Sequence, residues 1–241
     1  MSLRFLLAVT CAASVLVLGV LLATHLIAVD VTVQNRACGA APVAAAKKSP
    51  AKLLVLVIGG GANPQYDLFR TFWKLIAAQM RAQDIHVYVL SLDPGLTQPL
   101  LDVRAGTICF PGADNLVPGV LNQTVLALEL IARRKLPGHD APLILRTNLS
   151  TFWRLQELWL VLARRPAPGP LYGGLVYSFE GTAFATGVAV FWNAETVRVL
   201  LERHELLEYA SKVDDVAFGA FFPQVRRVPK EARVFLNCCK R

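Results

Sequence analysis

Leu53-Leu54-Val55-Leu56-Val57-Ile58, followed directly by Gly59-Gly60-Gly61, is the stretch that decides the fold of this chain. A continuous apolar run of this length predicts a strand that is buried on both faces, as in a parallel sheet. Glycines at the end of a first parallel strand let a nucleotide approach the backbone closely. The dinucleotide-binding fingerprint fails, however, because Pro64 occupies the position of its third glycine. A nucleotide-binding turn and a simple tight turn therefore both remain open here.

Strand-like and helix-like segments alternate after this first strand. The helix-like segments are residues 66–82, 118–135, 152–165, 194–205 and 214–222, and the strand-like segments are residues 86–91, 107–110, 142–146, 171–177 and 184–191. In the first of these helices, Leu68, Phe72, Leu75, Ile76 and Gln79 fall near one face, the pattern of a helix that packs on a core. The alternation predicts an α/β fold, a three-layer α/β/α sandwich around a mostly parallel sheet.

The N-terminal region predicts a membrane anchor. Residues 5–28 carry no charge and are nearly all apolar or small, and about 20 such residues span a bilayer. Arg4 before the segment and Asp30 after it orient the N-terminus to the cytosol. A cleaved signal peptide is the alternative, although its apolar region is usually shorter, about 7–15 residues. We expect a cytosolic tail over residues 1–4, a transmembrane signal anchor over 5–29, a flexible stem over 30–51 and a folded domain over 52–241.

Charge and cysteine content limit the classes of binding partner and of cysteine site that the sequence allows. The net charge is +8, but Lys and Arg are scattered in twos and threes without an aromatic-rich basic stripe, which argues against nucleic acid as a partner. In an exported protein, this basicity favours anionic membranes and phosphate-bearing substrates. Outside the apolar segment, Cys38, Cys109, Cys238 and Cys239 lack the spacing of a zinc site, so disulfides and inert thiols are the two interpretations.

Two adjacent carboxylates, Asp214 and Asp215, stand at the start of the last predicted helix. Aspartate at a helix start commonly caps free amide groups and favours the helix dipole. The alternative is that one aspartate caps the helix while the other faces a cleft as a general base, which takes the proton of a hydroxyl that attacks an activated sugar carbon. Upstream, Gly187 interrupts a bulky strand, which marks either a bulge or the close approach of a ligand or backbone.

A series of short motifs over about residues 53–222 resembles glycosyltransferases of the GT-A fold. The chain is most similar to the β-1,3-galactosyltransferase and Fringe-like group and to small glycosyltransferase domains of large algal viruses. The matching segments are Tyr66–Trp73 (the R-x-x-W of the first helix), Leu143–Phe152 (the strand end that carries the metal-binding TDDDxF in many members), Tyr172–Gly174 with Phe184–Val190 (the strand beneath the acceptor cleft), Asn193–Val197 (the opening of the next helix) and Asp214–Gly219 (E-D-V-x-x-G).

This resemblance implies a function and a site. Such an enzyme moves a hexose from a nucleotide-sugar donor to a hydroxyl of a glycan or glycoprotein, with inversion. The catalytic base of that group corresponds to Asp215, and Asp214 would orient it or cap the helix. Gly187 and Thr186 would leave room in the acceptor cleft. The implied donor-binding residues are Gly59, Gly60, Arg70, Arg146, Thr147, Asn148 and Ser150. With the predicted anchor, the resemblance implies a single-pass type II membrane protein of the Golgi or endoplasmic reticulum, with its body in the lumen.

The sequence departs from that group at the metal position, where Asn148-Leu149-Ser150 replaces Asp-x-Asp. Neutral amide and hydroxyl oxygens bind Mn²⁺ or Mg²⁺ weakly. Three outcomes stay open: a metal-free enzyme with Arg146 or another cation on the donor diphosphate, a substitute carboxylate such as Asp93 or Asp114, or a catalytically inactive module that binds a partner or glycan. An unrelated α/β hydrolase ranks below these, because the chain lacks a Gly-x-Ser-x-Gly elbow.

Overall fold

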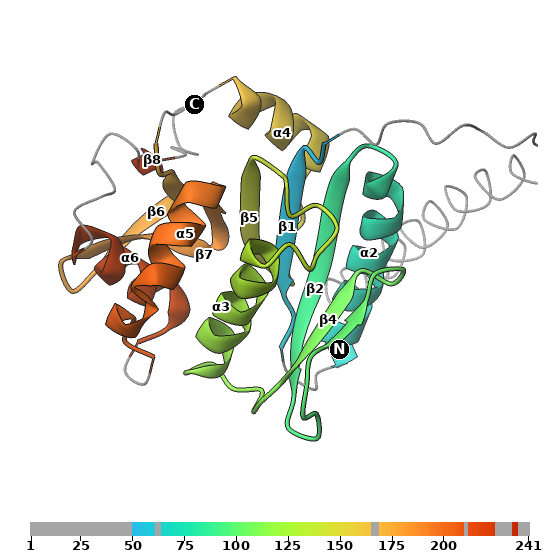
Figure 1. Cartoon of the computed structure of the whole chain (residues 1–241), viewed down its shortest axis with the longest axis horizontal. Helices are drawn as coiled ribbons and strands as arrows, with labels where there is room; N and C mark the ends of the chain where they lie inside the picture. The colour runs from blue at the N-terminus through green and yellow to red at the C-terminus, as the bar shows by residue number, and fades with distance from the viewer. Residues whose placement is uncertain (1–49, 61–63, 165–168, 210–211, 225–232, 236–241) are drawn as a thin grey trace, which may run out of the picture. The chain divides into compact units, whose positions relative to one another are not determined.

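The computed structural model describes residues 50–60, 64–164, 169–209, 212–224 and 233–235 (Figure 1). The predicted cytosolic tail, the anchor and nearly all of the stem lie outside these residues. Among the helices that are described, none has the length and hydrophobicity needed to cross a bilayer. Cys109 carries a free thiol, whereas Cys38, Cys238 and Cys239 lie outside the described residues.

Eight strands form one mixed sheet in the order β3-β4-β2-β1-β5-β7-β6-β8. The four central strands, β4, β2, β1 and β5, are parallel, whereas β3 and β7 run antiparallel to their neighbours. The predicted α/β fold with a mostly parallel sheet is therefore confirmed for the centre, and the edges are mixed. The strands are β1 (Leu53–Ile58), β2 (Ile85–Asp93), β3 (Leu100–Asp102), β4 (Thr107–Pro111), β5 (Leu143–Asn148), β6 (Tyr172–Phe179), β7 (Thr182–Trp192) and β8 (Arg233–Phe235).

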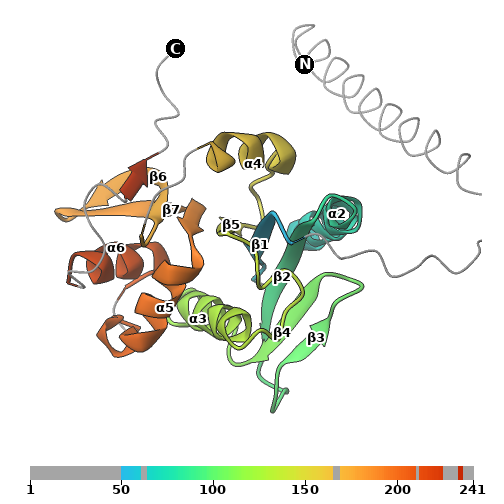
Figure 2. The same cartoon turned by 45° about the horizontal axis from the view of Figure 1, so that its top comes forward.

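Helices cover both faces of this sheet because β1 is apolar on both sides. Leu53, Val55 and Val57 belong to one core, which α2 and α4 cover. The alternate residues of β1 belong to the other core, beneath α3, α5 and α6 (Figure 2). The helices are α2 (Pro64–Arg81), α3 (Gly119–Ala132), α4 (Leu155–Ala163), α5 (Ala194–Glu202) and α6 (Asp214–Gln224), with a 3-10 turn η1 (His204–Leu206) after α5.

The predicted buried face of α2 is wrong except at Ile76, which packs against the core. Leu68, Phe72 and Leu75 are 58%, 51% and 56% exposed, and the helix packs on the sheet through Trp73 and Ala77 instead. Apolar residues surround most of this helix, so that their spacing alone does not select a face. The indole of Trp73 does select one, because it is fully buried and its Nε1 donates to the carbonyl of Leu149 at 2.9 Å.

Tyr88 on β2 is part of the core beneath α3. Its hydroxyl donates to the carbonyl of Pro137 at 3.1 Å. Burial raises the pKa of Tyr88 to about 12, against an opposing effect of Arg81. Between the ordinary tyrosine pKa of about 10 and this raised value, the folded chain keeps a proton that the unfolded chain has lost. We therefore expect stability to be unaffected by this group below about pH 10 and to fall as the pH rises toward 12.

A near-ultraviolet titration of tyrosinate checks this expectation. Tyr88→Phe should remove one late-ionising tyrosine of the folded protein and should flatten the loss of stability at alkaline pH. Tyr177→Phe is the matched control, because Tyr177 is 60% exposed. An unchanged late ionisation in Tyr88→Phe would contradict the assignment.

Candidate functional site

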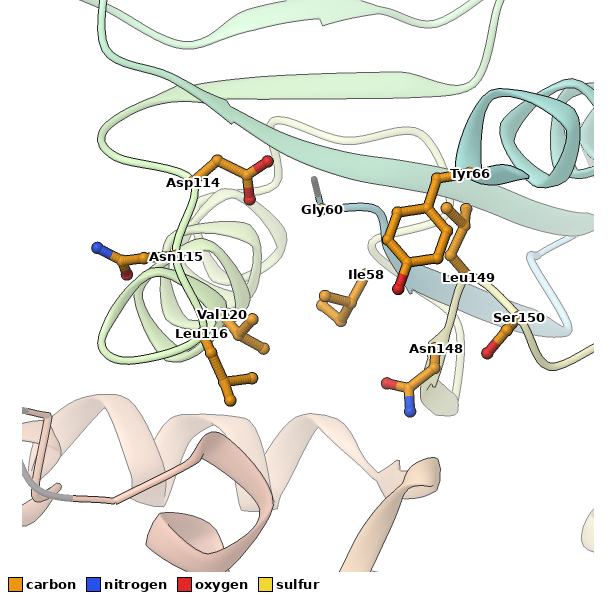
Figure 3. A pocket seen from close by; sticks show the side chains of 10 residues that line it. All are labelled: Ile58, Gly60, Tyr66, Asp114, Asn115, Leu116, Val120, Asn148, Leu149 and Ser150. Carbon is orange, nitrogen blue, oxygen red and sulfur yellow. The ribbon is translucent and has the colours of Figure 1, made fainter. Parts of the chain in front are cut away.

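A pocket of about 340 Å³ opens at the carboxyl ends of β1 and β5 (Figure 3). The chain leaves β1 through α2 to pair β2 on one side, and it later returns to pair β5 on the other side of β1. In an open α/β sheet, the crevice at such a change of direction is the usual place of a ligand. The pocket therefore lies where the topology of the sheet favours binding.

Polar side chains from four separate segments line this pocket. Tyr66 comes from the first turn of α2, Asp114 and Asn115 from the loop between β4 and α3, Asn148 from the end of β5 and Ser150 from the turn that follows. Ile58, Leu116, Val120 and Leu149 supply the apolar part of the lining. Asn115 also holds the start of α3, since its Oδ1 accepts the backbone N–H of Gly119 at 2.7 Å. Hydroxyl, amide and carboxylate groups thus converge on one cavity.

A side chain at either of the two predicted donor glycines would meet neighbouring atoms of the chain. A Cβ at Gly59 would stand 2.9 Å from the carbonyl oxygen of Leu90, and a Cβ at Gly60 would stand 2.9 Å from Oδ1 of Asp114. Gly60 lines the pocket, whereas Gly59 is not among the lining residues. The absence of a side chain at Gly60 therefore gives the Asp114 carboxylate its place at the pocket.

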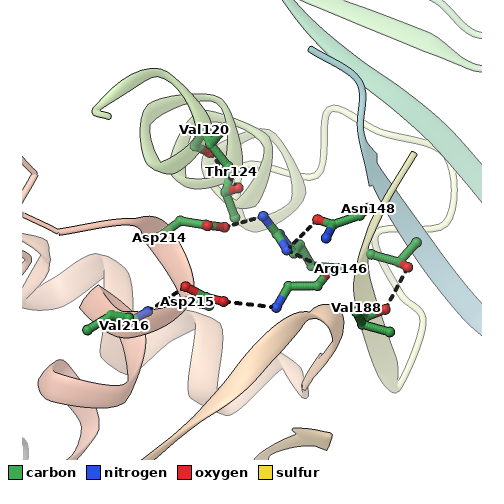
Figure 4. Close-up of polar contacts among 10 residues, drawn as sticks. Val120, Thr124, Arg146, Asn148, Val188, Asp214, Asp215 and Val216 are labelled. Carbon is green, nitrogen blue, oxygen red and sulfur yellow. Dashed lines mark hydrogen bonds and ion pairs between the residues drawn. The ribbon is translucent and has the colours of Figure 1, made fainter. Parts of the chain in front are cut away.

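Arg146 is the centre of a buried polar network behind the pocket (Figure 4). Its side chain is almost fully buried, and its guanidinium forms an ion pair with the buried carboxylate of Asp214. Nη1 of Arg146 also donates to Oδ1 of Asn148 at 3.0 Å and to the carbonyl of Gly187 at 2.7 Å. A Cβ at Gly187 would clash with this guanidinium. The Arg146 side chain thus fills the space beside Gly187. The register between β6 and β7 also shifts between Gly174 and Val176, opposite Gly187, which agrees with the bulge alternative.

This burial sets Arg146 apart from the residues that line the pocket. The guanidinium is not among the residues that line the pocket, and Asp214 balances its charge, so Arg146 is not placed to meet a donor diphosphate there. Its effect on the pocket passes through Asn148. Because Asn148 Oδ1 accepts from Arg146, the Nδ2 group is the part of this amide that remains to donate to a ligand.

The aspartate pair divides into an inner and an outer carboxylate. Burial raises the pKa of Asp214, the neighbouring Asp215 adds to the rise, and the Arg146 guanidinium opposes it. Asp215 is only half-buried; its Oδ2 accepts the N–H of Gly187 at 3.2 Å and its Oδ1 accepts the N–H of Val216 at 2.9 Å. A carboxylate has about four lone-pair sites. Asp215 therefore keeps free acceptor capacity, whereas the carboxylate of Asp214 is engaged by the Arg146 guanidinium.

The remaining predicted site residues lie outside the pocket lining. Thr147 is buried and ties β5 to β7, because its hydroxyl donates to the carbonyl of Val188 at 2.7 Å and accepts from Trp153 at 3.0 Å. Thr186 is half-buried on β7, and its hydroxyl has no hydrogen-bond partner within the described chain. Arg70 pairs with Asp67 on α2. None of these three side chains lines the pocket, although Thr147 and Arg70 were expected to bind the donor and Thr186 to lie in the acceptor cleft.

The donor set of the pocket does not fit a divalent cation. The described residues contain no group of three or more His, Cys, Asp or Glu side chains that could hold a metal ion. Among the lining residues, Asp114 supplies the single carboxylate, and the oxygen of Asn148 already accepts from Arg146. Asp93, the other proposed substitute, instead accepts the N–H of Gly95 at 2.8 Å in its own turn. Mg²⁺ needs near-octahedral oxygen coordination, which these groups do not offer.

Sequence reasoning found Asp114 as a candidate carboxylate but missed Tyr66 and Asn115 as pocket residues. A usable signal was present, since the Asp114-Asn115 pair follows closely after a predicted strand. Tyr66 carried no such signal, because its contact with the pocket depends on how α2 leaves β1. In comparisons with known proteins, the chain shows no significant match to a protein-family model or to a curated protein. The functional assignment therefore depends on the pocket and on the network behind it.

Proposed function

We propose that this protein is a glycosyltransferase of the GT-A type, which moves a hexose from a nucleotide sugar to a hydroxyl of a glycan or glycoprotein. The observation that carries the proposal is the polar pocket at the carboxyl ends of β1 and β5, linked through Asn148 and Arg146 to the Asp214–Asp215 pair. Its volume, about 340 Å³, falls within the usual range of small-molecule sites, roughly 300–1,000 Å³. The resemblance of the sequence motifs supports the same activity.

In this proposal the donor occupies the pocket. Asp114 accepts hydrogen bonds from hydroxyl groups of the donor, and the amide of Asn148 and the hydroxyl of Ser150 donate to its phosphate oxygens. Asp215 takes the proton of the acceptor hydroxyl as that oxygen attacks the anomeric carbon. The bond from that carbon to the diphosphate breaks on the opposite side, which gives inversion. Arg146 and Asp214 hold Asn148 and the start of α6 in place.

We further propose a location from the sequence. The apolar segment over residues 5–28 would anchor the chain as a single-pass type II membrane protein of the Golgi or endoplasmic reticulum, and the folded domain would lie in the lumen. Nucleotide-sugar and glycan partners would meet it there.

A second candidate is a glycosyltransferase-like module that binds a glycan or partner without transfer. The observation that favours it is the chemistry of the pocket, since the lining residues offer no cation to a diphosphate and no fitting set of metal ligands. Such a module would bind its ligand in this pocket without catalysing sugar transfer.

Calorimetry with the purified full chain and a panel of UDP- and GDP-sugars, with and without Mn²⁺, separates the two candidates. We expect one class of donor to bind with an affinity that Mn²⁺ does not change. Asn148→Ala should weaken this binding about tenfold, the loss of one hydrogen bond to a charged group. Asn122→Ala is the control, because Asn122 lies on α3 outside this pocket. A folded protein that binds a glycan but none of the donors would instead favour the module.

A further inference from the structure

Exposed hydrophobic side chains gather on one side of the sheet. Within the described chain, twelve large hydrophobic residues are exposed; seven of them belong to α2 or to residues 152–161, and none belongs to α3, α5 or α6. The helices on the two faces of the sheet therefore differ in what they present to their surroundings. We call six of these residues the apolar face: Leu68, Phe72, Leu75, Phe152, Leu160 and Val161.

The apolar face is not a part of the core that failed to close. α2 already packs on the sheet through Trp73 and Ala77, and α4 packs through Leu155 and Leu162. Phe152, which precedes α4, packs on α2, since its ring lies 5.9 Å from the ring of Phe72 and stacks at 5.6 Å on Trp73. Both helices thus pack on the sheet through other residues, and the six side chains of the apolar face stay exposed.

Cationic side chains accompany the apolar face. The described residues of α2 and of 152–164 carry five cations, Arg70, Lys74, Arg81, Arg154 and Arg164, and two anions, Asp67 and Glu157. Both anions pair with arginines of the same segments. The net charge of this region is therefore positive. Leucine and phenylalanine flanked by Lys and Arg are the composition of helices that lie in the interface of an anionic bilayer.

We propose that the apolar face docks on the surface of an anionic lipid bilayer. The predicted anchor over residues 5–28 and the 22-residue stem over 30–51 would keep the domain within about 75 Å of a membrane even when the stem is fully extended. A second copy of the chain fits less well, because two such faces would bring their cations together. The inference relies on the predicted anchor for proximity and goes beyond the proposed transferase activity.

Tryptophan fluorescence in the full chain tests the docking. Leu75→Trp places an indole on the apolar face, and Leu100→Trp places one at the equally exposed edge strand β3. Both variants share the background of the four native tryptophans. After reconstitution into phosphatidylcholine–phosphatidylserine vesicles with brominated acyl chains, we expect the added emission of Leu75→Trp to be blue-shifted and quenched, and that of Leu100→Trp to be neither. Omission of phosphatidylserine should reduce the quenching.

Phe72→Trp, an aromatic exchange on the same face, gives a second probe that does not depend on the fold tolerating Leu75→Trp. Equal quenching in the face and edge variants, or none in either, would overturn the proposal. A blue shift without quenching would mean that something other than lipid covers the apolar face. If this blue shift increases with protein concentration, a second copy of the chain covers the face. If it does not depend on concentration, other residues of the same chain cover it. Either result refutes lipid docking and leaves the donor-binding test unaffected.

Discussion

Arg146→Met is expected to lower the free energy of unfolding by about 3–5 kcal/mol, the usual cost of leaving one partner of a buried ion pair alone. Methionine fills much of the space of the arginine side chain but gives no charge to the buried Asp214 carboxylate. It also removes the hydrogen bonds to Asn148 and Gly187. Urea denaturation measures the loss as a lower midpoint at an unchanged slope.

Two comparisons make this result specific to the buried pair. Arg146→Met combined with Asp214→Leu should recover much of the loss, since no unpaired charge then remains in the core. Arg198→Met, which breaks the exposed Arg198–Glu202 pair on α5, should change the stability little. If Arg146→Met costs no more than Arg198→Met, the network does not hold this part of the fold together.

The loss of unfolding free energy in Arg146→Met should also depend on pH. Burial already raises the pKa of Asp214, and removal of the arginine takes away the main influence that lowers it. A group whose pKa is raised by folding stabilises the folded state below its unfolded pKa, and that contribution is lost as the pH rises. The difference in the free energy of unfolding between the variant and the parent chain should therefore be smallest at acid pH, where Asp214 is protonated, and largest at neutral pH.

Local patterns predicted the centre of the fold well. The apolar run of β1 required burial on both faces, and the glycines after it ended the strand. The direction of β7 was not predictable, because an apolar strand reads the same whichever way its neighbours run. The packed face of α2 was mispredicted for a related reason, since Trp73 finds its partner, the carbonyl of Leu149, far away in the sequence.

The candidate site was predictable in its residues but not in their arrangement. A charged residue such as Arg146 after an apolar run predicts the end of a strand. β5 nevertheless continues to Asn148, because Asp214, on a helix far away in the sequence, neutralises the charge of Arg146. Gly187 read as room for a ligand, and the room belongs to the Arg146 guanidinium. Both features depend on one contact between segments that are far apart in the sequence.

Asp215→Asn is expected to lower the rate of sugar transfer by about 10²–10⁴-fold, the usual contribution of a general base. The fold should tolerate this change, because asparagine keeps an oxygen that can accept the backbone N–H of Gly187 or Val216. Asp102→Asn is the matched control: this exposed carboxylate on β3 also accepts a backbone N–H, that of Ala105 at 2.9 Å, and lies outside the pocket. It should transfer sugar at the parent rate.

Donor binding measured beside transfer decides what Asp215 does. If Asp215→Asn binds the nucleotide sugar as the parent chain does but transfers it slowly, the carboxylate acts on the acceptor proton and not on the donor. If donor binding and the free energy of unfolding fall together, Asp215 stabilises the start of α6, and its contact with Gly187 is structural. If transfer continues at the parent rate in a folded variant, the base lies elsewhere. Because Asp214 is committed to Arg146, the neighbouring carboxylate could not take over, so a large loss of transfer with intact binding would assign the base to Asp215.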